Sequence, residues 1–206
     1  LGHESKVDSM EKQQLIDQLL LNNNGYVKTS EIIDASISKT YFAAYRKKKN
    51  LTKVAQGLFM TPEAWQDDLY ILQLRYPEAI FSHETASYLL DMTDREPMER
   101  SITLKAGKGS ARLNKEGVKV YKVKEDLLAV GLIEVLSPSG HKIRAYNKER
   151  TVCDLLRSRK KIVAQEIQSV LREYFHDRDR NIPQLMRYSK LFSVENIVKR
   201  YTEVLL

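Results

Sequence analysis

Residues 36–58 carry six Lys or Arg side chains and no Asp or Glu, although aromatic residues lie within the same segment. Ser38 can cap a helix, and at 100° per residue that helix places Tyr41, Phe42 and Tyr45 on one side. Its opposite side then carries mainly polar and basic residues. The segment therefore predicts an amphipathic helix that buries aromatic rings and presents cations outward.

The segments on either side of this basic helix follow a recognisable order. The apolar spacing of residues 11–22 predicts a helix, and Thr29 or Ser30 can cap a second, short helix. After the basic helix, residues 51–60 are expected to form two short strands with Gly57 at the bend. Three helices followed by a β-hairpin within about fifty residues is the order of a winged helix-turn-helix.

The remaining chain predicts a second domain. Residues 77–206 alternate strand-like and helix-like segments and end in helices, so we expect an α+β protein: a winged helix-turn-helix followed by a mixed α/β domain. The boundary is placed at Pro77, where a helical segment ends and the charge pattern changes. Residues 10–76 then form the winged-helix domain with a linker helix.

The first nine residues are set apart from this scheme. They are polar, and Met10 stands immediately before the first periodic segment. Residues 1–9 are therefore expected to be a remnant of cloning or a disordered tail.

The amino-acid composition suggests several kinds of partner and excludes several kinds of site. The formal net charge of +7 and the pI of about 9.3 suggest nucleic acid, an anionic membrane surface or an acidic partner. The single cysteine, Cys153, excludes an internal disulfide and a four-cysteine zinc site. No apolar run approaches the length of a membrane span, and the four histidines lack the spacing of metal ligands. We expect a cytoplasmic protein without a metal or cofactor.

The uneven distribution of charge favours double-stranded DNA as the partner, because a surface that serves solubility alone mixes both signs. The basic helix would enter the major groove, and the hairpin would act as the wing. Arg46 and Lys47 are both expected to be exposed. The predicted DNA contacts are base edges for Lys39, Thr40 and Arg46, phosphates for Lys28, Lys47, Lys48, Lys49 and Lys53, and further contacts from Thr29 and from Gln56 at the wing tip.

A second basic segment, residues 141–161, begins on a strand and enters a helix at Asn147. Arg150 and Asp154 are four residues apart and can pair on one helix face. This segment is either a structural salt link beneath a basic surface or a cationic groove for nucleic acid or an acidic partner, and the sequence does not choose between them.

Three other features have ordinary interpretations. Glu134 and Lys142 lie on neighbouring predicted strands, where a cross-strand ion pair is favoured over nuclease chemistry. His83 is expected at the start of a helix, in a capping or surface role. Residues 105–117 are rich in Gly and Lys but lack the P-loop pattern and are expected to form a basic loop between two strands.

Several segments together resemble the AbiEi family, the antitoxins of bacterial type IV toxin–antitoxin systems, which act in abortive infection and phage resistance. The resemblance covers nearly all of residues 10–206. Its pieces are "NNNGYVKTSEI", "LTKVAQGLFM", "IFSHETASYLLDM" and, most specifically, "IRAYNKERTVCDLL". This resemblance implies a winged helix that binds inverted repeats in the promoter of its own operon and represses transcription.

The resemblance also implies that the C-terminal domain neutralises a cognate nucleotidyltransferase-like toxin, without a stable complex between the two proteins. The candidate residues for this antitoxin function are Lys142, Arg144, Arg150 and Asp154. No catalytic constellation is evident, so the expected function is not enzymatic. Two alternatives stay open: a plain winged-helix regulator whose second domain binds a ligand or dimerises, and a metal-dependent nuclease.

Overall fold

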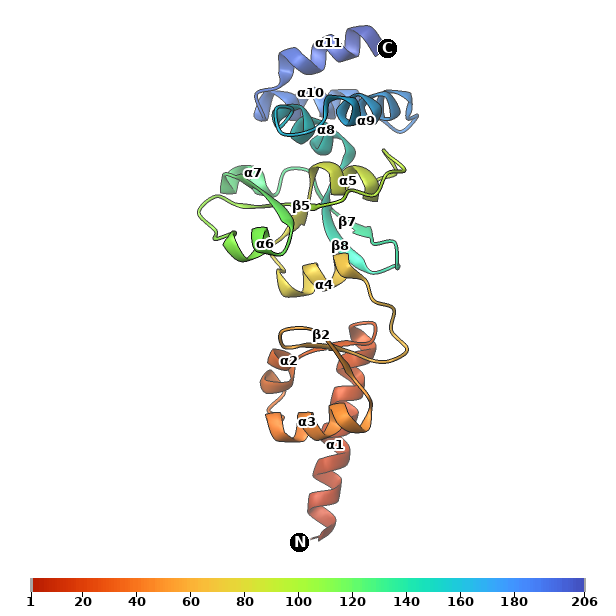
Figure 1. Ribbon diagram of the computed structural model, residues 1–206, viewed down its shortest axis with the longest axis vertical. Coiled ribbons are helices and arrows are strands. Elements are labelled where there is room, and N and C mark those ends of the chain that lie inside the picture. The colour runs from red at the N-terminus through yellow and green to blue at the C-terminus, as the bar shows by residue number, and fades with distance from the viewer. Residues whose placement is uncertain (1, 206) are drawn as a thin grey trace. The chain divides into compact units, whose positions relative to one another are not determined.

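The computed structural model describes residues 2–205 (Figure 1). The chain is an α+β protein that divides into two compact units, Leu1–Arg75 and Tyr76–Leu206. The boundary expected from the sequence, between residues 76 and 77, lies one residue from this division. Each unit has its own sheet and its own hydrophobic core.

The first unit combines four helices with a three-stranded antiparallel sheet in the order β1-β3-β2. The expected helices and hairpin are present, and residues 26–28, before the second helix, form a further strand that pairs with β3. The elements are α1 (Gly2–Asn22), β1 (Tyr26–Lys28), α2 (Thr29–Asp34), α3 (Lys39–Lys48), β2 (Thr52–Ala55), β3 (Leu58–Met60) and α4 (Asp68–Arg75).

Helix α1 begins at Gly2, so residues 2–9 continue the helix and do not form a disordered tail. The Tyr41 hydroxyl on α3 donates a hydrogen bond to the Ser9 carbonyl oxygen over 2.6 Å. This contact gives the N-terminal part of α1 a tertiary partner that the local sequence pattern could not indicate.

The second unit is built on a mixed five-stranded sheet in the order β6-β5-β4-β8-β7, and its later helices pack against one another in a separate layer (Figure 1). Its strands are β4 (Ile80–Phe81), β5 (Arg100–Lys105), β6 (Val118–Val123), β7 (Leu132–Leu136) and β8 (Lys142–Tyr146). Its helices are α5 (His83–Leu89), α6 (Ala111–Lys115), α7 (Glu125–Leu128), α8 (Lys148–Arg157), α9 (Ala164–His176), α10 (Ile182–Leu191) and α11 (Glu195–Leu205).

The prediction of a plain loop over residues 105–117 is wrong. Strands β5 and β6 are parallel neighbours, and parallel neighbours need a crossover connection, which here contains α6. The local sequence, rich in Gly and Lys, suggested two strands joined by a loop because it carries no information about strand direction.

Arg150 on α8 lies at the centre of the second unit and is fully buried. Its Nε donates to Asp154 Oδ1 over 3.0 Å, and its Nη1 donates to the carbonyl oxygens of Leu127 and Val130 over 2.8 Å each. The guanidinium carbon lies 3.9 Å from the ring centroids of both Tyr146 and Phe192. One side chain thus links β8, α8, α7 with the segment that follows it, and the residue after α10.

Gly131 makes room for this arrangement. Its φ is +77°, and a Cβ added there would lie 2.6 Å from the Arg150 Cβ. Its carbonyl oxygen accepts a hydrogen bond from the backbone N–H of Asn147, which caps α8. Only glycine satisfies both the backbone conformation and the close approach.

We predict that Gly131→Ala destabilises the protein more than Gly140→Ala. Gly140 has a φ of +85° but nothing within 4 Å of an added Cβ, so its substitution costs only the left-handed backbone, about 1–2 kcal/mol. Gly131→Ala adds overpacking against Arg150, which costs about 1–3 kcal/mol more. Urea unfolding of both variants measures the difference; equal losses would show that Arg150 moves aside at little cost.

Candidate functional site

The aromatic side of α3 faces inward, as the sequence predicts. Phe42 and Tyr45 are buried in a core cluster that includes side chains of α1, α2 and β3. The Phe42 ring packs edge-to-face against Phe59, with centroids 5.6 Å apart, and the Tyr45 hydroxyl donates a hydrogen bond to Asp17 on α1. These contacts fix the rotation of α3 about its own axis.

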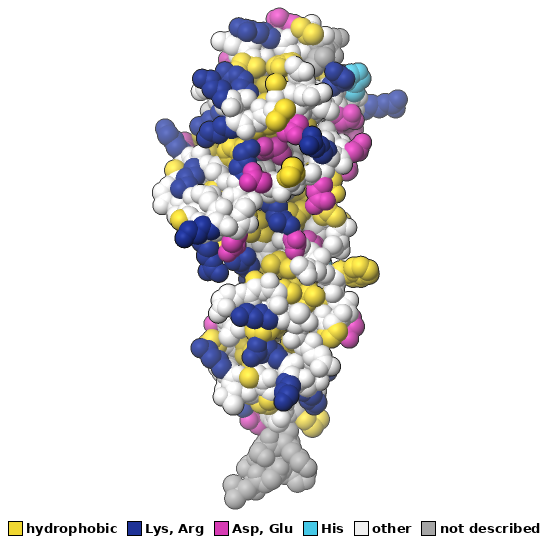
Figure 2. Space-filling model, in the orientation of Figure 1, with side chains coloured by type: hydrophobic (Ala, Val, Ile, Leu, Met, Phe, Trp, Pro, Cys, Tyr) yellow, Lys and Arg dark blue, Asp and Glu magenta, His cyan; other side chains and the backbone are white. Residues whose placement is uncertain are grey.

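The opposite side of α3 is exposed and cationic. Lys39, Thr40 and Lys47 are exposed, and so are Lys48 and Lys49 at the C-terminal end. Lys48 Nζ donates to Gln13 Oε1 over 3.0 Å, and Lys49 Nζ lies 3.6 Å from an Asp17 carboxylate oxygen. Figure 2 shows basic side chains spread over the visible face of the first unit, with few acidic ones among them.

Arg46 departs from the prediction that it is exposed. Its side chain is half-buried, and the guanidinium carbon lies 4.2 Å from the Phe59 ring centroid and 5.3 Å from that of Phe42. The Arg46 Nε is buried. The stem and guanidinium of arginine readily cover aromatic faces, so the side chain is drawn onto the core edge. Arg46 therefore stabilises the position of α3 and is not a freely extended base contact.

The predicted wing residues lie at the β2–β3 turn. Lys53 and Gln56 are exposed, and Lys53 Nζ donates to Gln56 Oε1 over 3.2 Å. Lys28 and Thr29 are half-buried at the start of α2, where the Thr29 N–H donates to the Gly57 carbonyl oxygen. The hydrogen bond from Thr29 holds the start of α2 against the turn between β2 and β3.

Three cations of this surface make no ion pair with a described acid. Among residues 8–204, whose side chains the structure describes, no ion pair involves Lys39, Lys47 or Lys53. A surface that maintained solubility alone would place acids among such residues. The exposed side chains of α3 and the β2–β3 turn therefore form a surface suited to an anionic partner, and we call Lys39, Thr40, Lys47, Lys48, Lys49, Lys53 and Gln56 the basic face.

The four candidate residues of the second unit do not form one surface. Lys142 is exposed and pairs with Glu134 over 2.8 Å across β7 and β8, which confirms the expected cross-strand ion pair. Arg144 donates to the Pro77 carbonyl oxygen over 2.7 Å. Arg150 and Asp154 are buried and paired, so they form the structural salt link.

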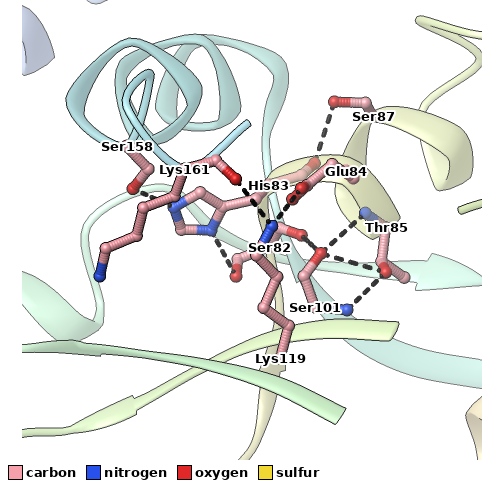
Figure 3. Close-up of polar contacts among 9 residues, drawn as sticks. All are labelled: Ser82, His83, Glu84, Thr85, Ser87, Ser101, Lys119, Ser158 and Lys161. Atoms are coloured by element: carbon pink, nitrogen blue, oxygen red, sulfur yellow. Dashed lines mark hydrogen bonds and ion pairs between the residues drawn. The ribbon is translucent and has the colours of Figure 1, made fainter. Parts of the chain in front are cut away.

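His83 has an environment that the sequence did not indicate, and the prediction of a capping or surface role is wrong. It is buried, with a φ of +50°, and its ring stacks on Tyr121 with centroids 3.4 Å apart. Nδ1 lies 2.9 Å from Ser82 Oγ, and Nε2 lies 3.0 Å from Ser158 Oγ (Figure 3). Because strand β6 and the end of α8 are distant in sequence, no local pattern could bring them to His83.

The pKa of His83 is lowered well below its usual range. Burial is the largest cause, and the positive charges of Arg150, Lys119, Arg157 and Lys161 act in the same direction. The ring is therefore neutral at pH 7, with one nitrogen donating and the other accepting. Each nitrogen has a serine hydroxyl as its partner.

The buried ring lies at the wall of a cleft of about 550 Å³. Its lining comes from His83 on α5, from β6, from α8 and from the segment that follows α8: His83, Val120, Tyr121, Lys122, Val123, Asp154, Arg157, Ser158, Arg159, Lys160 and Lys161. We call this the RSRKK cleft, after residues 157–161. The basic run is visible in the sequence, but its position opposite β6 is not.

Two further observations concern metals and membranes. Among the described residues, no group of three or more His, Cys, Asp or Glu side chains is placed to hold a metal ion. None of the helices between residues 2 and 205 has both the length and the apolar character needed to cross a membrane.

Comparison with known proteins gives a structural likeness only. No protein-family model and no curated protein matches the chain. A crystal structure of the RV2827C protein from Mycobacterium tuberculosis is similar, with a TM-score of 0.56 and 15% sequence identity. The match covers 92% of this chain and 78% of that one, and at this identity it bears on the fold alone.

We predict that His83 makes the protein less stable in mild acid. Below its ordinary pKa of about 6.5 the unfolded chain binds a proton that the folded chain rejects, so the unfolding free energy falls by up to about 1.4 kcal/mol per pH unit. Urea unfolding followed by circular dichroism between pH 7.5 and pH 5 measures this. His83→Asn keeps a residue that tolerates positive φ and should show a flatter pH dependence.

Comparing the natural chain with His83→Asn isolates the effect of His83, because the two chains share all their other titratable groups. Asp154, whose pKa burial raises to about 6 against the opposing effect of Arg150, is among them. Parallel stability curves for the two chains would show that His83 is not the group responsible.

Proposed function

We propose that the first unit is a winged helix-turn-helix that binds double-stranded DNA, and that the chain is an antitoxin of the AbiEi type that represses its own operon. The observation that carries the DNA-binding proposal is the basic face, whose cations are exposed while the aromatic side of α3 is buried. The order α1-β1-α2-α3-β2-β3, with β2 and β3 as a hairpin, supports the same interpretation.

In this proposal α3 enters the major groove of inverted repeats in the promoter. Lys39 and Thr40, at the N-terminal end of α3, reach base edges, as recognition helices generally read bases with their first residues. Lys47, Lys48 and Lys49 neutralise phosphates at the other end, and the β2–β3 turn brings Lys53 and Gln56 to the adjacent backbone. Arg46 acts by holding α3 against Phe59.

The antitoxin part of the proposal rests on the sequence resemblance. In this role the second unit neutralises a nucleotidyltransferase-like toxin, and the chain is not itself an enzyme. Because Arg150 and Asp154 are buried, their part in any antitoxin activity is to maintain the fold. The exposed parts of the second unit, including Lys142, would carry the activity.

A plain winged-helix regulator with a ligand-binding second unit is the second candidate, and the RSRKK cleft is the observation that favours it. Co-expression with the neighbouring gene separates the two. Rescue of growth from a toxic nucleotidyltransferase-like neighbour supports the antitoxin. If the product of the neighbouring gene is not toxic, or is toxic but is not neutralised, the plain winged-helix regulator is the remaining candidate.

We predict that Lys39→Ala combined with Lys47→Ala weakens binding to the operon's own promoter at least tenfold. Binding should fall with salt, with a slope of log K against log salt of about −4 to −5 for the natural protein if roughly four to six phosphates are neutralised. Each phosphate contact that is removed should make the slope of log K against log salt less negative by about one. A gel-shift titration at several salt concentrations measures both quantities.

The matched control is Arg187→Ala combined with Lys190→Ala. Both residues are exposed on α10, and the control removes the same charge from the second unit. It should leave promoter binding unchanged. Equal losses in the two variants, with both chains folded by circular dichroism, would show that net charge alone and not the basic face determines binding.

A further inference from the structure

The RSRKK cleft gathers basic side chains, and the acid in its lining, Asp154, is buried and paired with Arg150. Arg157, Arg159, Lys160 and Lys161 occupy four of five consecutive positions, and Lys122 lies on β6 across the cleft. Charges of one sign in a concave site reinforce one another's potential and concentrate anions there. Repulsion among these cations destabilises the folded chain when no ligand is bound, and a bound anion would relieve that repulsion.

Hydrogen bonds hold the segment that carries these charges. Ser158, at its start, meets His83 Nε2, and the Lys161 carbonyl oxygen, at its end, accepts from Lys119 Nζ over 3.4 Å (Figure 3). Between them, Arg159 Nη1 donates to the Leu156 carbonyl oxygen over 3.0 Å. In Figure 3 the Lys161 side chain extends away from the carbonyl that is held. The backbone is thus fixed while the Lys161 side chain projects from it.

His83 is itself fixed by a buried polar network. Ser82 Oγ accepts from Thr103 Oγ1 over 2.8 Å, and the Ser82 carbonyl oxygen accepts from Ser101 Oγ over 2.7 Å. Ser87 Oγ donates to the His83 carbonyl oxygen over 2.9 Å. These bonds join α5 to β5, so the wall of the cleft is preorganised by the sheet.

The acids near the cleft are already paired. Asp154 is bound to Arg150, and Glu84 is bound to Lys119 over 2.8 Å. Of residues 157–161, Arg157 lies close enough to Asp154 for its charge to act on the pKa of that carboxylate. Tyr121, which lines the cleft, has a buried hydroxyl beside the Lys119 ammonium, which can donate to its oxygen and leaves its proton free for an acceptor.

We propose that the RSRKK cleft binds a phosphorylated small molecule of about nucleotide size. Arg157 and Arg159 offer planar forks that match phosphate oxygens, Lys122, Lys160 and Lys161 add charge, and the Tyr121 hydroxyl donates a hydrogen bond. The volume of about 550 Å³ is within the range of small-molecule sites and exceeds what one phosphate group needs. This inference depends on the second unit alone and not on the proposed DNA binding.

Isothermal titration calorimetry of the full chain tests the proposal with four probes: ATP, AMP, inorganic phosphate and a single-stranded DNA oligonucleotide. We expect a nucleotide to bind with one site per chain, more tightly than inorganic phosphate, and more weakly as salt is raised. Binding of the oligonucleotide without binding of ATP or AMP would contradict the proposal, because it would mark a nucleic-acid surface. No heat with any of the probes at millimolar concentration would contradict it as well.

Variants of the cleft residues test whether the nucleotide binds in the RSRKK cleft. Arg157→Gln combined with Lys161→Gln should weaken nucleotide binding at least tenfold, and Tyr121→Phe, which removes only a hydroxyl, should weaken it several-fold. Arg187→Gln combined with Lys190→Gln, outside the cleft lining, should bind as the natural chain does. Equal weakening in this control, or unchanged binding in both cleft variants, would overturn the assignment.

Promoter binding is measured on the same proteins. Loss of nucleotide binding with promoter binding intact separates the RSRKK cleft from the basic face. If the promoter is not bound by the natural chain, the proposed function fails while the test of the cleft still stands.

Discussion

The inward packing of Phe42 and Tyr45 determines which side of α3 meets solvent. Both rings are buried beside side chains of α1 and β3, and the Tyr45 hydroxyl reaches Asp17. Because successive residues of a helix are rotated by 100°, fixing these rings inward places Lys39 and Lys47 on the outward side. The proposed DNA-binding surface is therefore a consequence of core packing, and Arg46 adds to it by covering Phe59.

In the second unit, the buried charge of Arg150 positions the surrounding elements, as the aromatic rings do in the first unit. Arg150 places one guanidinium beside two aromatic rings and donates to two carbonyl oxygens and one carboxylate oxygen. Removing one partner of such a pair leaves the other buried and uncompensated, which makes these residues costly to change without making them contacts for a partner. Loss of the proposed antitoxin activity on substitution of Arg150 or Asp154 would therefore reflect loss of the fold.

The sequence predicted those features that depend on local spacing. Helix α3, its cap at Ser38 and the hairpin that follows are local, and the pair Arg150–Asp154 follows from four-residue spacing on one helix. Features set by non-local packing were missed. Arg46 folds back onto a ring of β3, helix α6 exists because two strands run parallel, and His83 is buried by residues from β6 and α8. In each case the decisive neighbour is distant in sequence.

The central claim, that α3 lies in a DNA groove, can be tested with one introduced cysteine. The natural Cys153 is buried and its pKa is raised by burial, so a thiol-reactive iron chelate would label Lys47→Cys selectively. Bound to the promoter, the labelled chain should cleave both strands at positions clustered within each half of the inverted repeat. Uniform cleavage along the fragment, or cleavage no greater than from a label at Arg187→Cys, would contradict the account.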